Sequence, residues 1–275
     1  MSPISVFHCS DLHFGHPAVP EQYEALEALI QERRHDVVAI SGDLSQRARA
    51  GEFQRARVFI QNAEKVSKVL AIPGNHDVAW WFSPLGLGDD RQLLKKYRRY
   101  IRDDIEPVLR VPGATFVGIN TSHGITFRTL TWNLRDLSII GFVRDDQLAR
   151  AAAEFAKSPA GDARVLVLHH NAMKGELSRR HGLRNAARVH EAMQSMHVDL
   201  VLCGHDHQEA VHAVEHSTKR MTISTAGTIS NRARGGRPGS VNSIRITPTE
   251  IEIQTLTWSA DQRTFVDGPR QTFAH

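Results

Sequence analysis

Clusters of polar residue types follow several short apolar runs in this sequence. One cluster is Gly74-Asn75-His76-Asp77, which offers an amide, an imidazole and a carboxylate in consecutive positions after the apolar run 69–73. Four other apolar runs end similarly, at Asp11-x-His13, Gly42-Asp43, His169-His170 and Gly204-His205-Asp206-His207. Each motif alone is common by chance, but their joint occurrence predicts one shared site.

The polar residues in these motifs form a set of metal ligands. The set has two carboxylates, one amide and four imidazoles, with His76 beside them: Asp11, His13, Asp43, Asn75, His169, His205 and His207. It is too nitrogen-rich for calcium or magnesium alone and suits manganese, iron, zinc or cobalt. Seven ligands exceed what one ion takes, but they divide into two sets of four if one carboxylate bridges. We therefore predict two divalent transition-metal ions, roughly 3.5–4 Å apart.

Alternating strands and helices would bring these residues to one edge of a sheet. Apolar runs and helical spacing predict strands 4–9, 36–41, 68–73, 114–121, 164–169 and 198–203, and helices 20–34, 50–66, 145–157 and 183–196. Strand–helix–strand units form a parallel sheet whose carboxyl-end loops gather on one edge. Every motif follows one of these strands.

The character of the chain changes after Gln208. Alternating runs at 210–214, 219–225, 241–247 and 250–258 predict antiparallel strands. We expect them to form a second sheet packed on the first, with helices outside. The predicted fold class is α/β, as a four-layer α/β/β/α sandwich of two mixed sheets flanked by helices.

The stretch 78–112 interrupts the strand–helix pattern. It begins directly after Asp77, with Trp80 and Trp81 at its start and a basic helical stretch expected at 91–110. Insertions beside a motif edge often cover it, so 78–112 is predicted to be a cap. Two interpretations stay open, namely that its side chains select the substrate or that they pack the cap.

Composition narrows the class of protein. The chain has 275 residues, 41% of them hydrophobic, which can bury the core of a single domain predicted to span 1–275. A net charge of +4 identifies neither nucleic acid nor membrane as a partner, and the oligomeric state is not indicated. Two cysteines, Cys9 and Cys203, exclude a disulfide framework and are expected to be small buried hydrophobes. With no signal-peptide pattern and no membrane-spanning run, the protein is predicted to be soluble and cytoplasmic.

The order of the motifs resembles the calcineurin-like metallophosphoesterase family. The family pattern is Asp-x-His, Gly-Asp, Gly-Asn-His-Asp/Glu, a later His and Gly-His-x-His, and every element of it occurs between Asp11 and His207. The resemblance implies one ion held by Asp11, His13, Asp43 and His207. It implies a second ion held by Asp43, Asn75, His169 and His205, with Asp43 bridging the two.

The resemblance also implies a reaction. A water between two divalent ions loses a proton near neutral pH, and this metal-bridged hydroxide would hydrolyse a phosphodiester by in-line attack. His76, not a ligand in the family, would stabilise the developing charge or protonate the leaving alkoxide, and Asp77 would orient it. Asn75, His76 and the loop residue His123 are predicted to contact the substrate. The usual His-His-Pro is replaced by His169-His170-Asn171, so the loop beyond is expected to differ in shape.

The substrate class leaves alternatives open. Serine/threonine phosphatases of the family carry Gly-Asp-x-x-Asp-Arg-Gly, which is absent at 42–48. The length and the run Asn120-Thr121-Ser122 resemble small bacterial phosphodiesterases, so the predicted partner is a small anionic phosphodiester. The opening motif at 9–15 also resembles a double-strand-break repair exonuclease subunit, which makes a DNA nuclease the alternative, although no extra DNA-binding segment is visible. A catalytically silent metal-binding scaffold ranks third, because neither a ligand nor His76 is missing.

Overall fold

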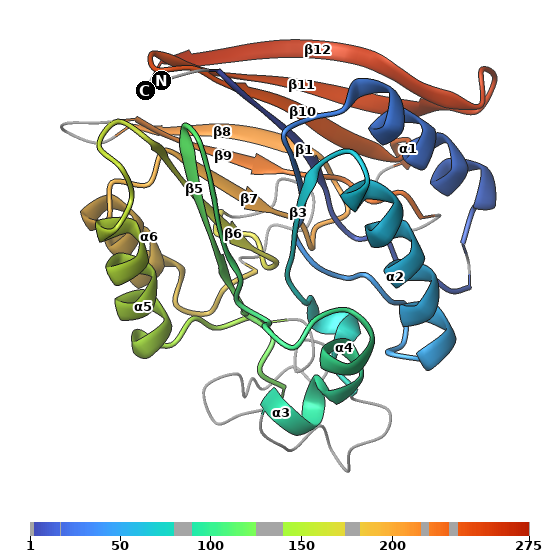
Figure 1. The fold of residues 1–275 in the computed structure, drawn as a ribbon, viewed down its shortest axis with the longest axis horizontal. Coiled ribbons are helices and arrows are strands. Elements are labelled where there is room, and N and C mark those ends of the chain that lie inside the picture. The colour runs from blue at the N-terminus through green and yellow to red at the C-terminus, as the bar shows by residue number, and fades with distance from the viewer. Residues whose placement is uncertain are drawn as a thin grey trace.

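Two sheets pack face to face between layers of helices. The structure is a computed structural model that describes residues 3–16, 18–79, 90–124, 140–173, 182–215, 220–230 and 236–274. Within these residues each sheet has six strands, and helices cover both outer faces (Figure 1). The predicted α/β sandwich of two mixed sheets flanked by helices is confirmed.

The first sheet has the strand order β12-β11-β10-β1-β2-β3. β1, β2 and β3 run parallel, and β10 to β12 continue from β1 as antiparallel neighbours. The bounds are β1 Ile4–Cys9, β2 Val37–Ile40, β3 Lys68–Ala71, β10 Ser240–Ile246, β11 Glu250–Ser259 and β12 Thr264–Ala274.

The second sheet has the strand order β4-β5-β6-β7-β9-β8. β5, β6, β7 and β9 are parallel, and the edge strands β4 and β8 are antiparallel to their neighbours. The bounds are β4 Val108–Val111, β5 Ala114–Ile119, β6 Ala163–Leu168, β7 Leu200–Cys203, β8 Ala210–Glu215 and β9 Arg220–Thr225.

The helices bury one face each against a sheet. α1, α2 and α4 contribute to a core on the outer face of the first sheet, and α5 and α6 to a core on the second. The bounds are α1 Pro20–Arg33, α2 Ala50–Glu64, α3 Asp90–Leu93, α4 Lys95–Tyr100, α5 Asp145–Ala156 and α6 Ala186–Ser195, with a 3-10 helix at Asn75–Asp77. Among the described residues, no helix has the length and apolar character to cross a bilayer.

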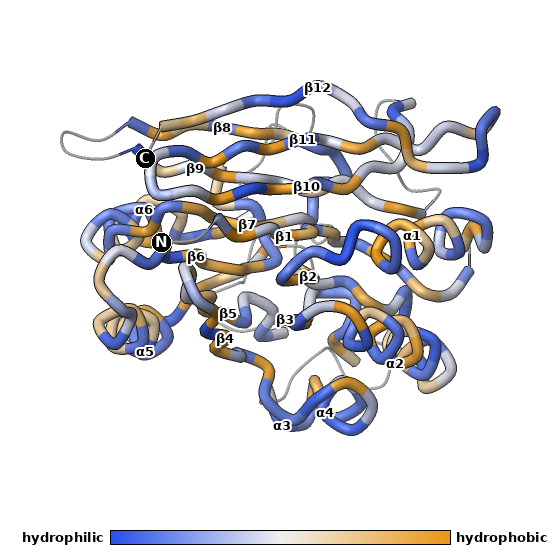
Figure 2. Tube along the Cα trace, turned by 45° about the horizontal axis from the view of Figure 1, so that its top comes forward, coloured by the Kyte–Doolittle hydropathy of each residue, from blue (hydrophilic) through white to orange (hydrophobic). Residues whose placement is uncertain are grey.

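Burial on both faces explains the continuous apolar runs of the central strands. In β1, Phe7 and Cys9 join the core beneath the helices, whereas Ile4 and Val6 join the core between the sheets. Figure 2 shows hydrophobic residues concentrated along these inner strands, while hydrophilic residues predominate along β12. The sheets therefore form a rigid frame, and the loops after their strands can place polar groups accurately.

The strands after Gln208 do not form a sheet of their own. That expectation is wrong, because β8 and β9 extend the second sheet beside β7, whereas β10 to β12 extend the first beside β1. Each antiparallel addition satisfies the backbone hydrogen bonds of a parallel strand that would otherwise be an open edge. β12 was not predicted, since only one of its residues, Phe265, is buried and its apolar alternation is weak.

The stretch 91–110 is not one helix. It contains the short helices α3 and α4 and the strand β4, which turns back through Pro112-Gly113 to pair with β5. Tyr97 of α4 is fully buried and donates a hydrogen bond from its hydroxyl to the Ala71 carbonyl at 3.0 Å. This part of the predicted cap therefore belongs to the core of the domain. Trp80 and Trp81 lie outside the described residues, and the cap itself stays a prediction.

Candidate functional site

The seven predicted ligands come together in the structure. Asp11 and His13 follow β1, Asp43 follows β2, and the remaining four follow β3, β6 and β7: Asn75, His169, His205 and His207. These loops lie at the carboxyl ends of parallel strands from both sheets, where polar groups that end a buried strand must meet. Two sets can be distinguished, which share Asp43.

The first set consists of Asp11, His13, Asp43 and His207. One donor atom from each lies within 4.8 Å of the others. The Nε2 atoms of His13 and His207 are 3.0 Å apart, and His207 Nε2 is 3.1 Å from Asp11 Oδ1. Asp11 Oδ1 is buried, and among the described residues its one polar neighbour within 3.5 Å is this imidazole, so a cation would help to satisfy it.

The second set consists of Asp43, Asn75, His169 and His205. The amide oxygen of Asn75 lies 3.0 Å from His169 Nε2 and 3.1 Å from His205 Nδ1. Asp43 Oδ2 is 3.4 Å from His169 Nε2 and 3.8 Å from His13 Nε2. One carboxylate oxygen therefore faces imidazoles of both sets.

The backbone at these positions is unusual. Five of the predicted ligands have φ in the left-handed region, at 53° for Asp11, 47° for His13, 53° for Asp43, 74° for His205 and 55° for His207. Each such residue costs roughly 1–2 kcal/mol and persists only where the surroundings enforce it. Their clustering at one point indicates a functional site rather than chance strain.

Two motif glycines leave the space that the carboxylates occupy. A Cβ on Gly74 would lie 2.2 Å from Asp43 Oδ1, and one on Gly204 would lie 2.4 Å from Asp11 Oδ2. No side chain fits at these distances, so the turns can approach the carboxylates only as glycine. The glycines in the sequence motifs thus follow from close packing of the loops.

Burial keeps two of the predicted ligand imidazoles neutral, whereas a third is protonated in the metal-free protein. Burial lowers the pKa of His13 and His205 to about 3, so both imidazoles are neutral, as ligands must be. Burial acts on His169 in the same direction, but the charges of Asp43 and Asp11 outweigh it and raise its pKa to about 9. Burial alone would raise the pKa of Asp43, yet the neighbouring imidazoles, His169 foremost, hold it well below its usual range.

A backbone carbonyl orients His169. Its Nδ1 donates to the Ser41 carbonyl oxygen at 2.8 Å, which leaves Nε2 as the ligand nitrogen. Ser10 Oγ donates to the same oxygen at 3.2 Å, and the Ser41 hydroxyl lies 3.0 Å from His8 Nε2. His8 is buried, which lowers its pKa to about 3, and both of its ring nitrogens lie near serine hydroxyls, so it is a core histidine.

His76 lies beside the first set. Its ring centroid is 4.8 Å from that of His13, and its backbone N–H donates to Asp43 Oδ1 at 2.7 Å. Its Nδ1 donates to the Gln46 carbonyl oxygen at 2.9 Å. The turn that presents Asn75 therefore presents this imidazole at the same edge.

The hydrogen bonds of Asp77 go to the neighbouring loops and not to the His76 imidazole, and its catalytic role stays a prediction. Its carboxylate accepts hydrogen bonds from Leu44 N at 3.1 Å, Gly74 N at 3.0 Å, and Ser45 N and Oγ at 2.7 and 2.8 Å. It clamps the loop after β2 to the turn after β3. Burial, followed by the charge of Asp43, raises its pKa to about 7.

His123 is buried, and its Nδ1 accepts a hydrogen bond from the Arg144 guanidinium at 3.0 Å. It is close enough to His170 to influence that imidazole electrostatically. Contact between His123 and substrate stays a prediction.

His170, the second residue of the histidine pair, lies beside the second set. It is buried, its Nδ1 is 2.6 Å from Thr121 Oγ1, and its ring centroid is 4.5 Å from that of His205. Burial lowers the pKa of the His170 imidazole well below the usual range.

Both cysteines are buried, as predicted. Burial raises the pKa of the Cys9 and Cys203 thiols to about 12.

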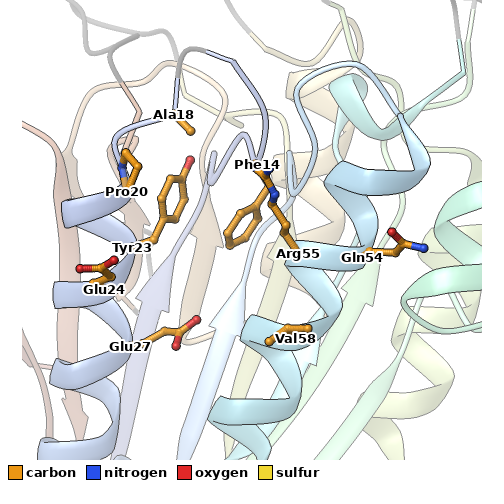
Figure 3. Close-up of a pocket in the computed structure, with 9 residues that line it drawn as sticks. All are labelled: Phe14, Ala18, Pro20, Tyr23, Glu24, Glu27, Gln54, Arg55 and Val58. Atoms are coloured by element: carbon orange, nitrogen blue, oxygen red, sulfur yellow. The ribbon is translucent and has the colours of Figure 1, made fainter.

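A separate groove of about 440 Å³ lies between α1 and α2 (Figure 3). Its residues are Phe14, Ala18, Pro20, Tyr23, Glu24, Glu27, Gln54, Arg55 and Val58. Phe14 and Tyr23 stack in it with their centroids 4.6 Å apart. No predicted ligand lines this groove, so the candidate site is the loop edge.

Comparison with known proteins identifies the family. A model described as calcineurin-like phosphoesterase matches residues 4–209, which is more than half of the 275-residue chain and includes every predicted ligand. The chain belongs to the calcineurin-like phosphoesterase family. A comparison with curated proteins found no match.

Solved structures support the calcineurin-like fold. Purple acid phosphatase PPD1 from yellow lupin (Lupinus luteus) is 10% identical with a TM-score of 0.69, covering 99% of this chain and 54% of that one. PhoD is 11% identical with a TM-score of 0.65, covering 100% and 70%. GAP50, the anchor in the inner membrane complex of Plasmodium, is 14% identical with a TM-score of 0.55, covering 94% and 85%. The chain spans about half the length of the lupin phosphatase, and at these identities the likeness concerns the fold alone.

The donor set fits a metal centre. Buried imidazoles, buried carboxylates and an amide oxygen converge from loops of both sheets, and four of these residues could hold one ion together. Such mixed nitrogen and oxygen ligands favour divalent transition metals over calcium or magnesium.

Proposed function

We propose that this calcineurin-like phosphoesterase is a two-metal phosphodiesterase. The first set, Asp11, His13, Asp43 and His207, would hold one ion. The second set, Asp43, Asn75, His169 and His205, would hold the other. Manganese, iron, zinc or cobalt would suit both sets.

One observation carries the proposal. Asp43 Oδ2 lies 3.8 Å from His13 Nε2 and 3.4 Å from His169 Nε2, between two groups of imidazoles. A shared carboxylate is what two ions roughly 3.5–4 Å apart require. The position of this one oxygen supports two ions over one.

The ions, when bound, would neutralise charge on the phosphoryl group and lower the pKa of water at the site. The protein would supply the proton for the leaving group. Nδ1 of His76 carries a proton because a carbonyl oxygen, that of Gln46, can only accept. Its Nε2 would be the atom that faces the substrate, and when this nitrogen also carries a proton it would transfer that proton to the departing alkoxide, while Asn75 and His123 would position the substrate. Asp77 would contribute indirectly, because its hydrogen bonds hold the turn that carries Asn75 and His76.

A diester substrate is favoured by the resemblance to small bacterial phosphodiesterases, with a DNA nuclease as the alternative. GAP50, which has a similar fold, is described as an anchor. A catalytically silent metal-binding scaffold therefore stays the third candidate function. A cytoplasmic location stays a prediction from the sequence.

Metal content and a substrate panel test the function. Elemental analysis of active protein should find two transition-metal ions per chain, and chelation should abolish activity. An aryl phosphodiester should be hydrolysed with a higher kcat/KM than the matching monoester or DNA. Full activity after chelation, or a single ion in active protein, would refute the two-metal assignment. Preference for DNA would select the nuclease, and two bound ions without turnover would select the scaffold.

The role of His76 is tested separately. His76→Ala should keep its metal content and lose roughly 10²–10⁴-fold in turnover, as expected for a lost general acid. His212→Ala, in the edge strand β8, is the matched control and should turn over normally. Loss of metal from His76→Ala would show that the imidazole is a ligand instead.

A further inference from the structure

Asn171 replaces the proline expected after the histidine pair, and its side chain is held in one orientation. It is 2% exposed. Its Oδ1 accepts a hydrogen bond from Met173 N at 2.9 Å, and its Nδ2 donates to Asp206 Oδ2 at 2.9 Å. Because a backbone N–H can only donate and a carboxylate can only accept, flipping the amide would break both bonds.

Asp206 depends on this contact. It is the central residue of Gly204-His205-Asp206-His207 and is 7% exposed. Within the described part of the chain, the Asn171 amide is the one hydrogen-bond donor to its carboxylate. A buried carboxylate needs such a donor, since water no longer solvates it. The two residues therefore hold each other.

The pair joins two loops that carry ligands of the second set. The loop after β6 begins with His169, and the loop after β7 contains His205. Gly204 N donates to the His169 carbonyl oxygen at 3.0 Å, and the Asn171–Asp206 bond adds a crosslink further along both loops. His169 Nε2 and His205 Nδ1 both lie close to one atom, Asn75 Oδ1, at 3.0 and 3.1 Å, so their separation depends on how these loops are joined.

We propose that the Asn171–Asp206 pair is a positioning element that sets the spacing of His169 and His205 for the second ion. This inference rests on the proposed two-metal function. Partners that orient ligands usually change metal affinity by roughly 10–100-fold when removed. The bond needs an acceptor at residue 206 but not a charge there, because the oxygen of an asparagine could accept from Asn171 equally well.

Cobalt(II) is the probe, because its absorption bands report ligand geometry. Metal-free wild type, Asn171→Ala, Asp206→Ala, Asp206→Asn and the double alanine variant would be titrated by calorimetry and spectroscopy. Asn171→Ala and Asp206→Ala should each weaken the second ion about 10-fold or more and shift its absorption bands. The first ion should stay within roughly threefold of wild type. The double variant should lose no more than either single one, and Asp206→Asn should resemble wild type.

Asn185→Ala is the matched control. Asn185 also makes two hydrogen bonds that join loops, donating to Val143 O at 2.7 Å and accepting from Val143 N at 3.2 Å, but it follows no ligand. It should leave both cobalt constants unchanged.

The outcomes separate this inference from the function beneath it. Wild type with one ion would refute both. Two ions in wild type with unchanged constants in the variants, or additive losses in the double variant, would overturn the positioning role alone. A loss in Asp206→Asn as large as in Asp206→Ala would overturn it too, by showing that charge matters rather than the bond. If Asn171→Ala does not fold, the two Asp206 variants decide.

Discussion

The two ligand sets share Asp43 but are built differently. In the first set, Asp11, His13, Asp43 and His207 all have φ between 47° and 55°. His13 Nδ1 is buried without a hydrogen-bond partner among the described residues. In the second set, His169 has ordinary backbone and its Nδ1 is bonded to the Ser41 carbonyl oxygen. All four residues of the first set therefore have an enforced backbone conformation, whereas in the second set only Asp43 and His205 do, and His169 is held by a hydrogen bond between loops.

The two sets also differ in the charge of their ligands. The first set carries two carboxylates, whereas the second has one carboxylate and an amide. Hard divalent ions prefer the more anionic oxygen ligands. We therefore expect the first ion to bind more tightly and the second to respond more strongly to single substitutions around it.

The largest effect is expected where the two sets meet. Asp43→Ala should remove both ions and lower kcat/KM by about 10³-fold or more, since several kcal/mol of charge stabilisation are lost. Elemental analysis and steady-state kinetics would measure it. Retention of one tightly bound ion would mean that the carboxylate is not shared and that the two sets are independent.

Single ligands should separate the sets. His13→Ala should weaken the first ion and His169→Ala the second, each by at least about 100-fold, because even indirect partners of ligands contribute 10–100-fold. Calorimetric titration of the metal-free variants resolves the two constants. Equal weakening of both ions in either variant would contradict the division into sets.

A glycine pair probes how tightly the loops pack around Asp43. Gly74→Ala would bring a methyl group to within 2.2 Å of Asp43 Oδ1 and should lower the free energy of unfolding by about 1–3 kcal/mol. Gly51→Ala, in α2 with nothing within 4 Å, is the control and should be neutral or stabilising by up to about 1 kcal/mol. Chemical denaturation measures both. A neutral Gly74→Ala would show that the loop can move away from the carboxylate.

The smallest effect per residue is the pH dependence of the free energy of unfolding in metal-free protein. His8, His13 and His205 have pKa values lowered to about 3, so the unfolded chain binds more protons than the folded one between that pH and about 6.5. The free energy of unfolding should therefore fall as pH drops from 6.5 to 5, by roughly 1.6 kcal/mol for each of these three histidines. The pKa of His169 is raised to about 9, so its protonated form stabilises the folded state at low pH. This stabilisation is lost as pH rises from about 6.5 to 9.

Denaturation at pH 5, 6.5 and 8 in the presence of a chelator checks both limbs. His8→Gln removes one of the three histidines without touching a predicted ligand, so it should flatten the acid limb. Increasing stability on acidification below pH 6.5 would contradict the neutral state of these imidazoles.

The sequence by itself determined the strand–helix order and which residues meet. Asp11, Asn75 and His205 could be assigned to one edge because apolar periodicity predicts strands and parallel strands end on the same side. The motif glycines were likewise readable as turns. These signals are local, since each depends on residues within a few positions of one another.

Only the tertiary structure decided the partners. Whether β10 joins β1 or β9 depends on which open edge it can satisfy, and no local pattern encodes that choice. In the same way, His76 binds the Gln46 carbonyl instead of Asp77, and Asn171 binds Asp206 from a different loop. A buried polar group takes whichever donor or acceptor the packed chain brings within about 3 Å, and residues distant in sequence supply it.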